Sequence, residues 1–268
     1  MIMLLSFYVL LKHLATMIQS LTHKVRTRRA NRQLGGLLAF VAGAANAGGF
    51  LAIQRYTSHM TGIVSEIADN LVLGNLYLGA AGLAALGAFT AGAATTAVLV
   101  NWARRRHLHS EYAFSLMLEA VLLLLFGLLG ANLNALIDIF LPATVLVLSF
   151  IMGLQNAIVT KISKAEIRTT HMTGIVTDLG IELGRLFYWN RALDANAEHF
   201  VEADRDKLGI HATILGLFFA GGLVGALSFK QLGFVASVPL ALLLSAIAAP
   251  MLWQDIGDWL HRRNGGRP

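Results

Sequence analysis

The chain has 268 residues, of which 56% are hydrophobic and 13% are charged, and its mean hydropathy is +0.64. Soluble domains carry roughly a quarter charged residues, so this composition excludes an ordinary soluble globular protein. The formal net charge is +6, but the basic residues stand in short clusters beside apolar runs, which argues against nucleic acid as a partner. Cys is absent, which excludes disulfides, thiolate metal sites and a Cys nucleophile.

The N-terminal segment 1–33 is predicted to be amphipathic, basic and cytoplasmic. Its apolar stretch 1–11 is too short to cross a bilayer and is interrupted by Lys12. No positive region precedes this stretch and no small-residue cleavage site follows it, so it is not typical of a signal peptide. We expect an in-plane amphipathic helix or an over-long start of translation, and we assign the segment no function.

Six later segments are apolar and long enough for transmembrane helices, which need about 20 residues. They are 34–53, 76–101, 112–131, 141–160, 209–229 and 233–253. Two further segments, 61–75 and 173–188, look helical but are too short to span and contain acidic residues. We predict that these two are broken or re-entrant helices, which a membrane tolerates where they are buried in protein or line a wet cavity.

The basic residues determine the predicted orientation. With the N-terminus in the cytoplasm, all but Arg55 and Lys230 of the 21 Lys and Arg residues lie on the cytoplasmic side, as the positive-inside rule requires. Treating the two short segments as extra spans would place the Arg104–Arg106 cluster outside, against that rule. We therefore predict an inner-membrane protein with both termini in the cytoplasm, ending in a basic tail, 254–268.

A duplicated motif is the most informative feature of the sequence. The segment 57–66, Thr-Ser-His-Met-Thr-Gly-Ile-Val-Ser-Glu, recurs at 169–178 as Thr-Thr-His-Met-Thr-Gly-Ile-Val-Thr-Asp. A Gly-x-x-Asn-Ala motif precedes each copy and a Gly-x-Phe-x-Ala-Gly motif follows it. These flanking motifs lie at 43–47 and 153–157, and at 87–92 and 216–221. Three motifs repeated in the same order indicate an internal duplication.

The duplication predicts the architecture. The first repeat is 34–131 and the second is 141–253, and each contains three of the predicted spans. Because three crossings is an odd number, the second repeat must enter the membrane in the opposite orientation, and the charge distribution requires the same. The predicted fold class is therefore an all-α membrane protein of six transmembrane helices, a 3+3 inverted repeat with one short broken or re-entrant helix in each half. Secondary transporters often follow this plan, with sites near the midplane where broken helices meet.

The chain resembles the YoaK family, bacterial multi-pass membrane proteins described as candidate permeases. The resemblance covers roughly residues 34 to 253 and rests on Asn46-Ala47 with Phe50-Leu51, on 59–62, on 152–157 and on 168–174. It implies a bacterial inner-membrane location and supplies no established activity. The family usually has Asp-Ala at Asn46-Ala47, and Asn where Ile63 and Ile175 follow Thr-Gly, so a role of those residues is not carried over to this chain.

The two His-Met-Thr-Gly segments are the predicted substrate site. Thr61 and Thr173 stand where a helix could begin, so we expect each Thr to cap free backbone N–H groups, and Gly62 and Gly174 to permit an unusual turn. The N-terminus of a half-helix inside the membrane offers N–H donors and a partial positive charge suited to an anion. Two such ends from opposite faces would form a pseudo-symmetric site. Alternatively, the segments are hairpins outside the membrane whose Thr residues only cap helices.

Four more polar residues belong to this predicted site. His59 and His171 precede the helix starts and are expected to be neutral, because the positive helix end disfavours a charged imidazole. Two His residues without further ligands do not indicate a metal site, and no metal or cofactor is predicted. Asn46 and Asn156 lie within spans, where each either bonds a neighbouring helix or contacts substrate.

Three acidic residues are candidates for coupling transport to an ion. Glu66 and Asp178 occupy matching positions of the repeat, and Glu119 is the one acid well inside a span. Acids within the membrane are costly and indicate functions such as proton coupling. An interfacial or paired Glu119 is the alternative.

The function predicted from these features is transport of a small polar or anionic solute. A membrane scaffold or accessory protein is the alternative, followed by a channel or a membrane-embedded enzyme. The chain has no Gly-x-Ser-x-Gly elbow, His-Glu-x-x-His motif or phosphate loop, so an enzyme is not expected. The expected partners are the lipid bilayer, an unidentified solute and, in a homo-oligomer, a second copy of the chain.

Overall fold

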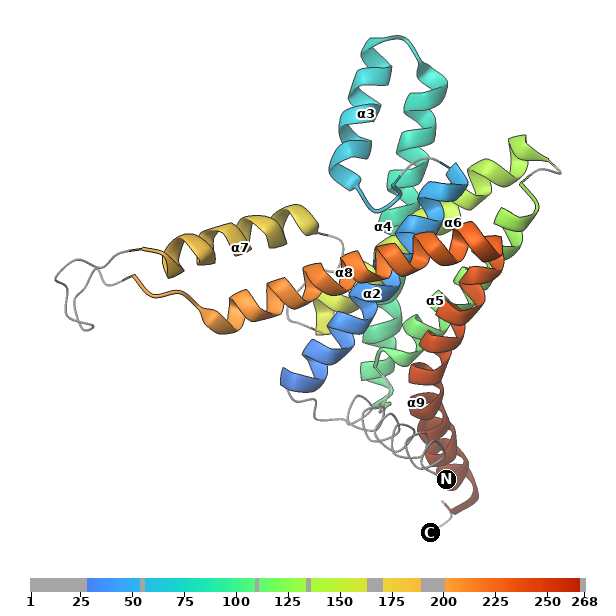
Figure 1. The fold of residues 1–268 in the computed structure, drawn as a ribbon. Coiled ribbons are helices and arrows are strands. Elements are labelled where there is room, and N and C mark those ends of the chain that lie inside the picture. The colour runs from blue at the N-terminus through green and yellow to red at the C-terminus, as the bar shows by residue number, and fades with distance from the viewer. Residues whose placement is uncertain are drawn as a thin grey trace, which may run out of the picture.

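The computed structural model describes residues 28–53, 56–108, 111–133, 136–162, 171–188 and 201–265, and all regular structure in these ranges is helical. The apolar N-terminal stretch, for which an in-plane helix is expected, lies outside these residues. The helices are α2 (Arg28–Ile53), α3 (Met60–Val72), α4 (Leu76–Arg105), α5 (Ala113–Ala131), α6 (Ile137–Ile162), α7 (Met172–Leu186), α8 (Arg205–Leu232), the short 3-10 helix η1 (Gly233–Ala236) and α9 (Ser237–Gly265) (Figure 1).

The long helices carry the apolar runs. By length and composition, five helical stretches among the described residues could cross a membrane: Arg32–Leu51, Leu76–Arg105, Ala113–Ala131, Ile137–Ile162 and Arg205–Asp258. The last stretch has 54 residues and would be about 80 Å long if it were straight. It is instead divided at η1, where Gly233 has a φ of 61° and α8 turns into α9 (Figure 1).

The two short helices match the segments predicted to be too short to span. α3 has 13 residues and α7 has 15, which correspond to about 20 Å and 22 Å of helix. α3 packs against α4, and α7 packs against α8. The two helical hairpins project from the rest of the protein in different directions (Figure 1).

Glycines bring α2 and α8 into close contact. An added Cβ at Gly43 would overlap the backbone carbonyl of Phe218, and one at Gly221 would overlap the carbonyl of Phe40. Only glycine therefore fits at these two positions, because the neighbouring backbone occupies the space of a side chain.

The same arrangement joins α4 and α6. A Cβ at Gly153 would overlap the carbonyl of Phe89, and one at Gly92 would overlap the carbonyl of Phe150. Gly43 and Gly153 begin the Gly-x-x-Asn-Ala motif, while Gly92 and Gly221 end the Gly-x-Phe-x-Ala-Gly motif. In each sequence repeat, the helix that carries the Gly-x-x-Asn-Ala motif thus packs against the helix that carries the Gly-x-Phe-x-Ala-Gly motif of the other repeat.

The remaining long helices complete the fold. α5 packs against α9 and α6, and Gly127 lies against Ser237 at the start of α9. Buried apolar side chains such as Leu38, Leu116 and Leu148 form the shared core.

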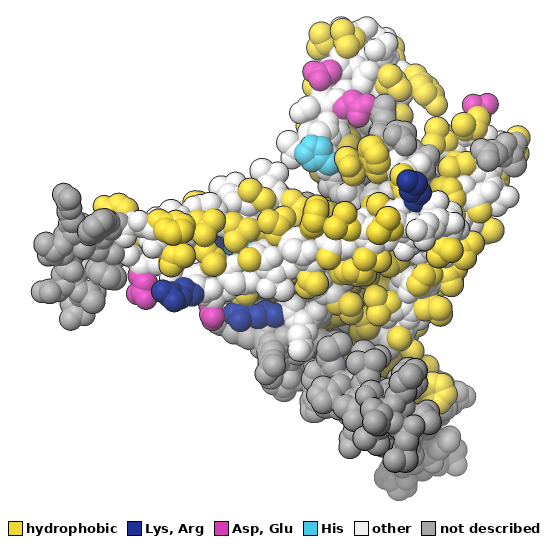
Figure 2. Space-filling view, in the orientation of Figure 1, with side chains coloured by type: hydrophobic (Ala, Val, Ile, Leu, Met, Phe, Trp, Pro, Cys, Tyr) yellow, Lys and Arg dark blue, Asp and Glu magenta, His cyan; other side chains and the backbone are white. Residues whose placement is uncertain are grey.

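Large apolar side chains also cover the outside of the protein. Phe219 is 65% exposed and Leu242 is 64% exposed, and Figure 2 shows apolar side chains spread along α8 and α9 with few charged residues among them. Such an extended apolar surface would be unfavourable in water and is suited to contact with lipid.

Candidate functional site

The helix starts at the two His-Met-Thr-Gly segments differ from the sequence prediction. α3 begins at Met60 and α7 at Met172, with His59 and His171 as the N-cap residues. No N-cap side chain bonds the backbone at either helix. The expected capping by Thr61 and Thr173 is therefore wrong, because each Thr already lies inside the first helical turn.

The glycines of these segments have a different role from the predicted one. Neither Gly62 nor Gly174 has a positive φ, so the expected unusual turn is also wrong. Each glycine instead makes room for the preceding imidazole ring. A Cβ at Gly62 would lie 2.7 Å from Nε2 of His59, and one at Gly174 would lie 2.7 Å from Cε1 of His171. The shared His-x-x-Gly spacing thus places a ring over the first turn of each short helix.

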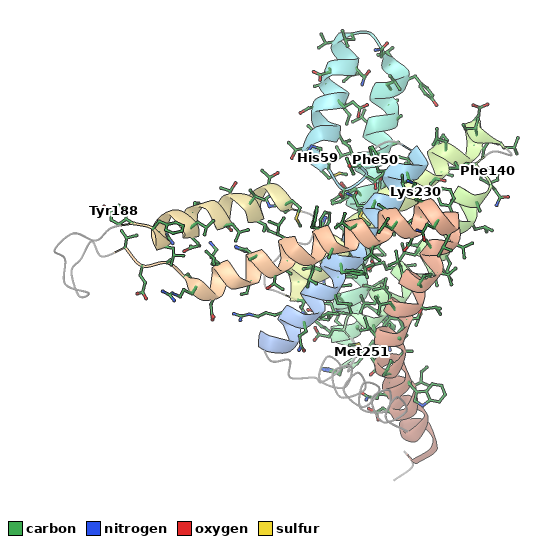
Figure 3. The ribbon with its side chains drawn as sticks, viewed as in Figure 1. Phe50, His59, Phe140, Tyr188, Lys230 and Met251 are labelled. Atoms are coloured by element: carbon green, nitrogen blue, oxygen red, sulfur yellow. The ribbon has the colours of Figure 1, made fainter. Side chains whose placement is uncertain are left out.

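Contacts with α2 hold the segment that precedes α3. The hydroxyl of Ser58 donates a hydrogen bond of 2.9 Å to Oδ1 of Asn46, and Tyr56 stacks on Phe50 with ring centroids 4.7 Å apart. His59 follows directly, at the start of α3 (Figure 3). Asn46 therefore holds the loop between α2 and α3 through its side-chain oxygen, a contact with a loop residue and not with a neighbouring helix.

Asn156 is the corresponding residue of the second repeat. It is half-buried on α6, and its backbone carbonyl accepts a hydrogen bond of 2.7 Å from the hydroxyl of Thr160. The part of the second repeat that corresponds to Ser58 falls in 163–170, which lies outside the described residues.

The His and Thr residues of the predicted substrate site lie at the surface in the part of the chain that the structure describes. His59, Thr61, His171 and Thr173 are exposed. Within the described residues, no hydrogen bond or ion pair joins the His, Met, Thr and Gly side chains of the first segment to those of the second.

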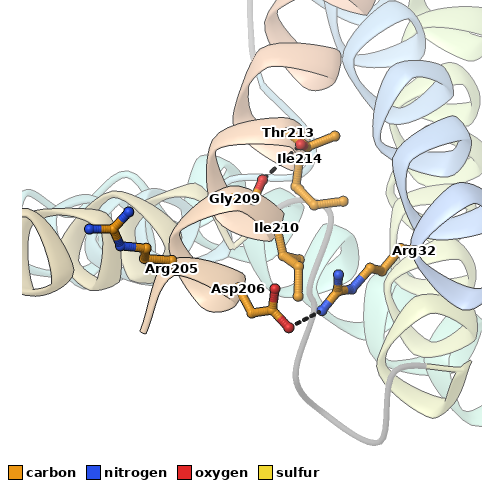
Figure 4. A pocket seen from close by; sticks show the side chains of 7 residues that line it. All are labelled: Arg32, Arg205, Asp206, Gly209, Ile210, Thr213 and Ile214. Carbon is orange, nitrogen blue, oxygen red and sulfur yellow. Dashed lines mark hydrogen bonds and ion pairs between the residues drawn. The ribbon is translucent and has the colours of Figure 1, made fainter. Parts of the chain in front are cut away.

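A pocket of about 290 Å³ lies elsewhere, between the N-terminal parts of α2 and α8. Its polar lining comes from Arg32, Arg205, Asp206 and Thr213 (Figure 4), and none of the predicted site residues contributes to it. Arg32 and Asp206 are 3.4 Å apart, with 38% and 79% of their side chains exposed. Such an exposed pair contributes little to stability.

Asp178, a predicted coupling residue, belongs to a polar cluster between α7 and α8. Its Oδ2 lies 3.6 Å from Nζ of Lys207 and 3.9 Å from Nε2 of His211. His211 is 3% exposed, and its Nδ1 has no hydrogen-bond partner among the described residues. His211 was not among the predicted site residues, although a His near the start of the predicted span 209–229 is a signal visible in the sequence.

A buried carboxylate closes the same hairpin. Glu182 is 1% exposed, and it accepts hydrogen bonds from the backbone N–H of Asp204 at 2.9 Å and from the guanidinium of Arg185 at 3.0 Å. Asp204 in turn caps α8 by accepting a hydrogen bond from the N–H of Lys207. Glu182 therefore ties the end of α7 to the start of α8.

The first repeat closes its hairpin with neutral groups. Nδ2 of Asn75, the N-cap residue of α4, donates to Oδ1 of Asn70 at 3.3 Å, and Nδ2 of Asn70 donates to the carbonyl of Glu66 at 2.8 Å. The two hairpins thus place polar contacts in a similar arrangement but differ in the charge of the residues. Ion pairs hold the α7–α8 hairpin, and amide groups hold the α3–α4 hairpin.

Glu119 is a buried acid without a partner in the described part of the chain. It is 0% exposed, and neither carboxylate oxygen has a hydrogen-bond partner there. Burying an unpaired carboxylate costs about several kcal/mol even after the protein relaxes. No partner among the described residues supports the paired alternative.

Other buried polar atoms lie on α5 and α6. The hydroxyls of Ser115 and Ser149 are buried without a partner among the described residues. Gln155 is also buried, and its Nε2 donates to the carbonyl of Leu38 at 3.2 Å while its Oε1 is left unpaired. The sequence analysis did not select Gln155, although an amide in the middle of an apolar run was a visible signal.

Long apolar helices, a lipid-compatible outer surface and polar groups buried between the helices define an all-helical, multi-pass membrane protein. The chain belongs to the DUF1275 family, described as a protein of unknown function, whose sequence model matches residues 34–249. No curated protein and no solved structure matches the chain.

Proposed function

We propose that this protein is a carrier for a small polar or anionic solute, with six spans arranged as a 3+3 inverted repeat. The observation that carries the proposal is the reciprocal packing of α2 on α8 and of α4 on α6. Equivalent glycines make equivalent contacts in both pairs, which is expected when two copies of one unit are related by a pseudo-two-fold axis. Inverted repeats of this kind are common among secondary transporters.

The proposed solute site uses the N-termini of α3 and α7. Each helix is shorter than the roughly 30 Å hydrocarbon core of a bilayer, and each begins with the same His-Met-Thr-Gly segment. The first-turn N–H groups of a helix attract anions. In the proposed carrier, the solute is bound in a conformation in which the two helix starts face it.

The inner-membrane location and the cytoplasmic termini belong to the same proposal, supported by the position of the basic residues. The resemblance to the YoaK family, carried by the paired His-Met-Thr-Gly segments, adds to it. In this proposal Thr61 and Thr173 contact the solute through their exposed hydroxyls.

Flux in proteoliposomes tests the proposal. Vesicles that contain the full chain are offered radiolabelled phosphate, sulfate and small carboxylates, with a proton gradient imposed in either direction. We expect saturable, gradient-dependent uptake of one of these anions. The Thr61→Val/Thr173→Val variant should lose at least tenfold of this flux, while Thr90→Val should keep it, since Thr90 is an exposed residue of α4 that bonds only its own helix.

The other outcomes identify the alternatives. Flux without saturation would indicate a channel, and no flux of any anion would favour a scaffold. Unchanged flux in the double Thr variant would remove the two helix starts from the solute site. Turnover of a compound that is lost in His171→Ala but kept in His59→Ala would indicate an enzyme.

A further inference from the structure

We propose that Glu119 is the proton-binding site of this protein and that it holds its proton in the described conformation. Its role in coupling rests on the proposed carrier function, whereas the binding of the proton does not. Among the three candidate coupling acids, the structure distinguishes Glu119 by its burial and by its lack of partners.

The burial of Glu119 determines its protonation state. The side chain is fully buried in α5, and both carboxylate oxygens lack a hydrogen-bond partner among the described residues. A negative charge at this position would have neither solvent nor an opposite charge to stabilise it. The neutral carboxyl group is therefore the form that fits the site.

The helices packed against α5 supply no compensating charge at this level. α6 carries Asp138 and Lys161 near its two ends, and α4 carries its charges in the last turn. On α9, the hydroxyl of Ser245 lies 3.9 Å from Sδ of Met117, two residues before Glu119, so this part of α5 lies at the level of the apolar middle of α9. The described charged residues of α9, Asp255 and Asp258, lie about three to four turns beyond Ser245.

Two hydroxyl groups accompany the carboxyl group. Ser115 precedes Glu119 by one helical turn, so both residues lie on the same face of α5. Counted in residues from the α5–α6 turn, Ser149 on α6 and Glu119 on α5 lie at about the same distance along their helices. Both hydroxyls are buried and unpaired in the described part of the chain, so neutral polar groups lie one turn away from Glu119 on α5 and at a similar level on α6.

A proton fits this site better than a metal cation does. A bound cation requires several oxygen ligands that converge at about 2.5 Å. No described donor or acceptor comes within hydrogen-bonding distance of either Glu119 oxygen. Protonation needs no converging ligands and leaves no net charge.

The other two acids have different surroundings. Asp178 is 39% exposed and lies 3.6 Å from Lys207, so its negative charge has both solvent and a partner. Glu66 is only half-buried. Neither residue is buried without a partner.

Carbodiimide labelling tests the assignment without any transport measurement. Dicyclohexylcarbodiimide is an apolar reagent that reacts with protonated carboxyl groups in apolar surroundings. We expect the purified full chain in detergent to form an adduct on the peptide that contains Glu119. The adduct should decrease as the pH is raised and disappear in Glu119→Gln, while Asp178→Asn should keep it.

The same experiment has outcomes that overturn the proposal. Absence of the adduct on Glu119 at every pH would show that no protonated carboxyl group resides there. Protection from labelling by sodium ions at constant pH would assign the site to a metal cation instead.

Thermal unfolding gives a second, independent readout. The native site favours neutral Glu119, so the folded protein binds more protons than the unfolded chain, and its stability should fall as the pH rises. Glu119→Gln resembles the neutral form and should lose this part of the pH dependence. Equal pH dependence in both proteins would contradict the assignment.

The two proposals fail separately. A labelled Glu119 in a protein that shows no flux would leave the proton site standing and reject the carrier. Flux with the same dependence on the proton gradient in wild type and Glu119→Gln would keep the carrier and remove Glu119 from coupling.

Discussion

Individual polar residues in this protein have roles that depend on their partners across helices. Glu182 shows this most clearly, since its buried carboxylate joins the backbone of Asp204 to the guanidinium of Arg185. Glu119 has the same chemical group and no partner among the described residues. The surroundings therefore assign one carboxylate to structure and the other to proton binding.

The role of Glu182 leads to a prediction for stability. Glu182→Ala should lower the free energy of unfolding by about 1–3 kcal/mol, because it leaves a buried N–H donor unpaired. Glu182→Gln should lower the free energy of unfolding by less, since its amide oxygen still accepts a hydrogen bond from the backbone N–H of Asp204. Glu202→Ala is the matched control, because Glu202 is an exposed acid near the same hairpin.

Thermal or denaturant unfolding in detergent measures these differences. A Glu182→Ala variant as stable as Glu202→Ala would show that the tie between α7 and α8 contributes nothing.

The residue scale also shows what the sequence analysis could and could not predict. The recurrence of His59 and His171 was visible in the repeat, and the structure places both at helix starts. The packing of each ring on Gly62 or Gly174 was not visible, because a His-x-x-Gly spacing does not show which rotamer the ring adopts. The isolation of Glu119 depends on neighbours from other helices and was equally hidden.

At the scale of helices, glycine positions set which pairs approach closely. Gly92 and Gly153 both face backbone of the partner helix, whereas an added Cβ at Gly87 would meet nothing within 4 Å. Gly87 and Gly92 lie in the same apolar run, yet a side chain should be tolerated at Gly87 and not at Gly92.

This difference predicts opposite effects on stability. Gly153→Ala should destabilise the protein by about 1–3 kcal/mol or more, because the new methyl group forces α4 and α6 apart. Gly87→Ala should be neutral or stabilising by up to about 1 kcal/mol, since alanine favours a helix over glycine. Thermal unfolding of both variants in the same detergent checks the difference.

Equal stability of the two variants would contradict the close packing of α4 on α6. Gly92→Ala is a second test of the same contact from the other helix, and it should behave like Gly153→Ala.

At the scale of the whole molecule, the two repeats interlock. The first long helix of each repeat lies against the Gly-x-Phe-x-Ala-Gly helix of the other, and α5 packs against α9. The α3–α4 and α7–α8 hairpins extend from this centre in different directions (Figure 1). An inverted repeat requires the tips of these hairpins to face opposite sides of the membrane.

Cysteine labelling checks this topology, because the chain has no native Cys. Val72 at the end of α3 and Phe187 after α7 are 88% and 81% exposed. We expect an impermeant thiol reagent to label Val72→Cys from the periplasm and Phe187→Cys from the cytoplasm only. Arg106→Cys is the cytoplasmic reference, since it lies in a basic cluster.

Labelling of Val72→Cys and Phe187→Cys from one side would eliminate the inverted arrangement. It would also remove the main support for the carrier proposal.

The amino-acid sequence alone determined that this is a helical membrane protein with a duplicated motif, because apolar run length and repeated residues are local properties of the chain. It also located each long helix, although α2 begins at Arg28, before the predicted start at 34, and α9 continues to Gly265, through most of the segment predicted as a tail. Only the tertiary structure decided which helices meet, that Asp178 is paired and that Glu119 is buried without a partner in the described residues. Those facts depend on contacts between segments far apart in the chain, which local periodicity does not encode.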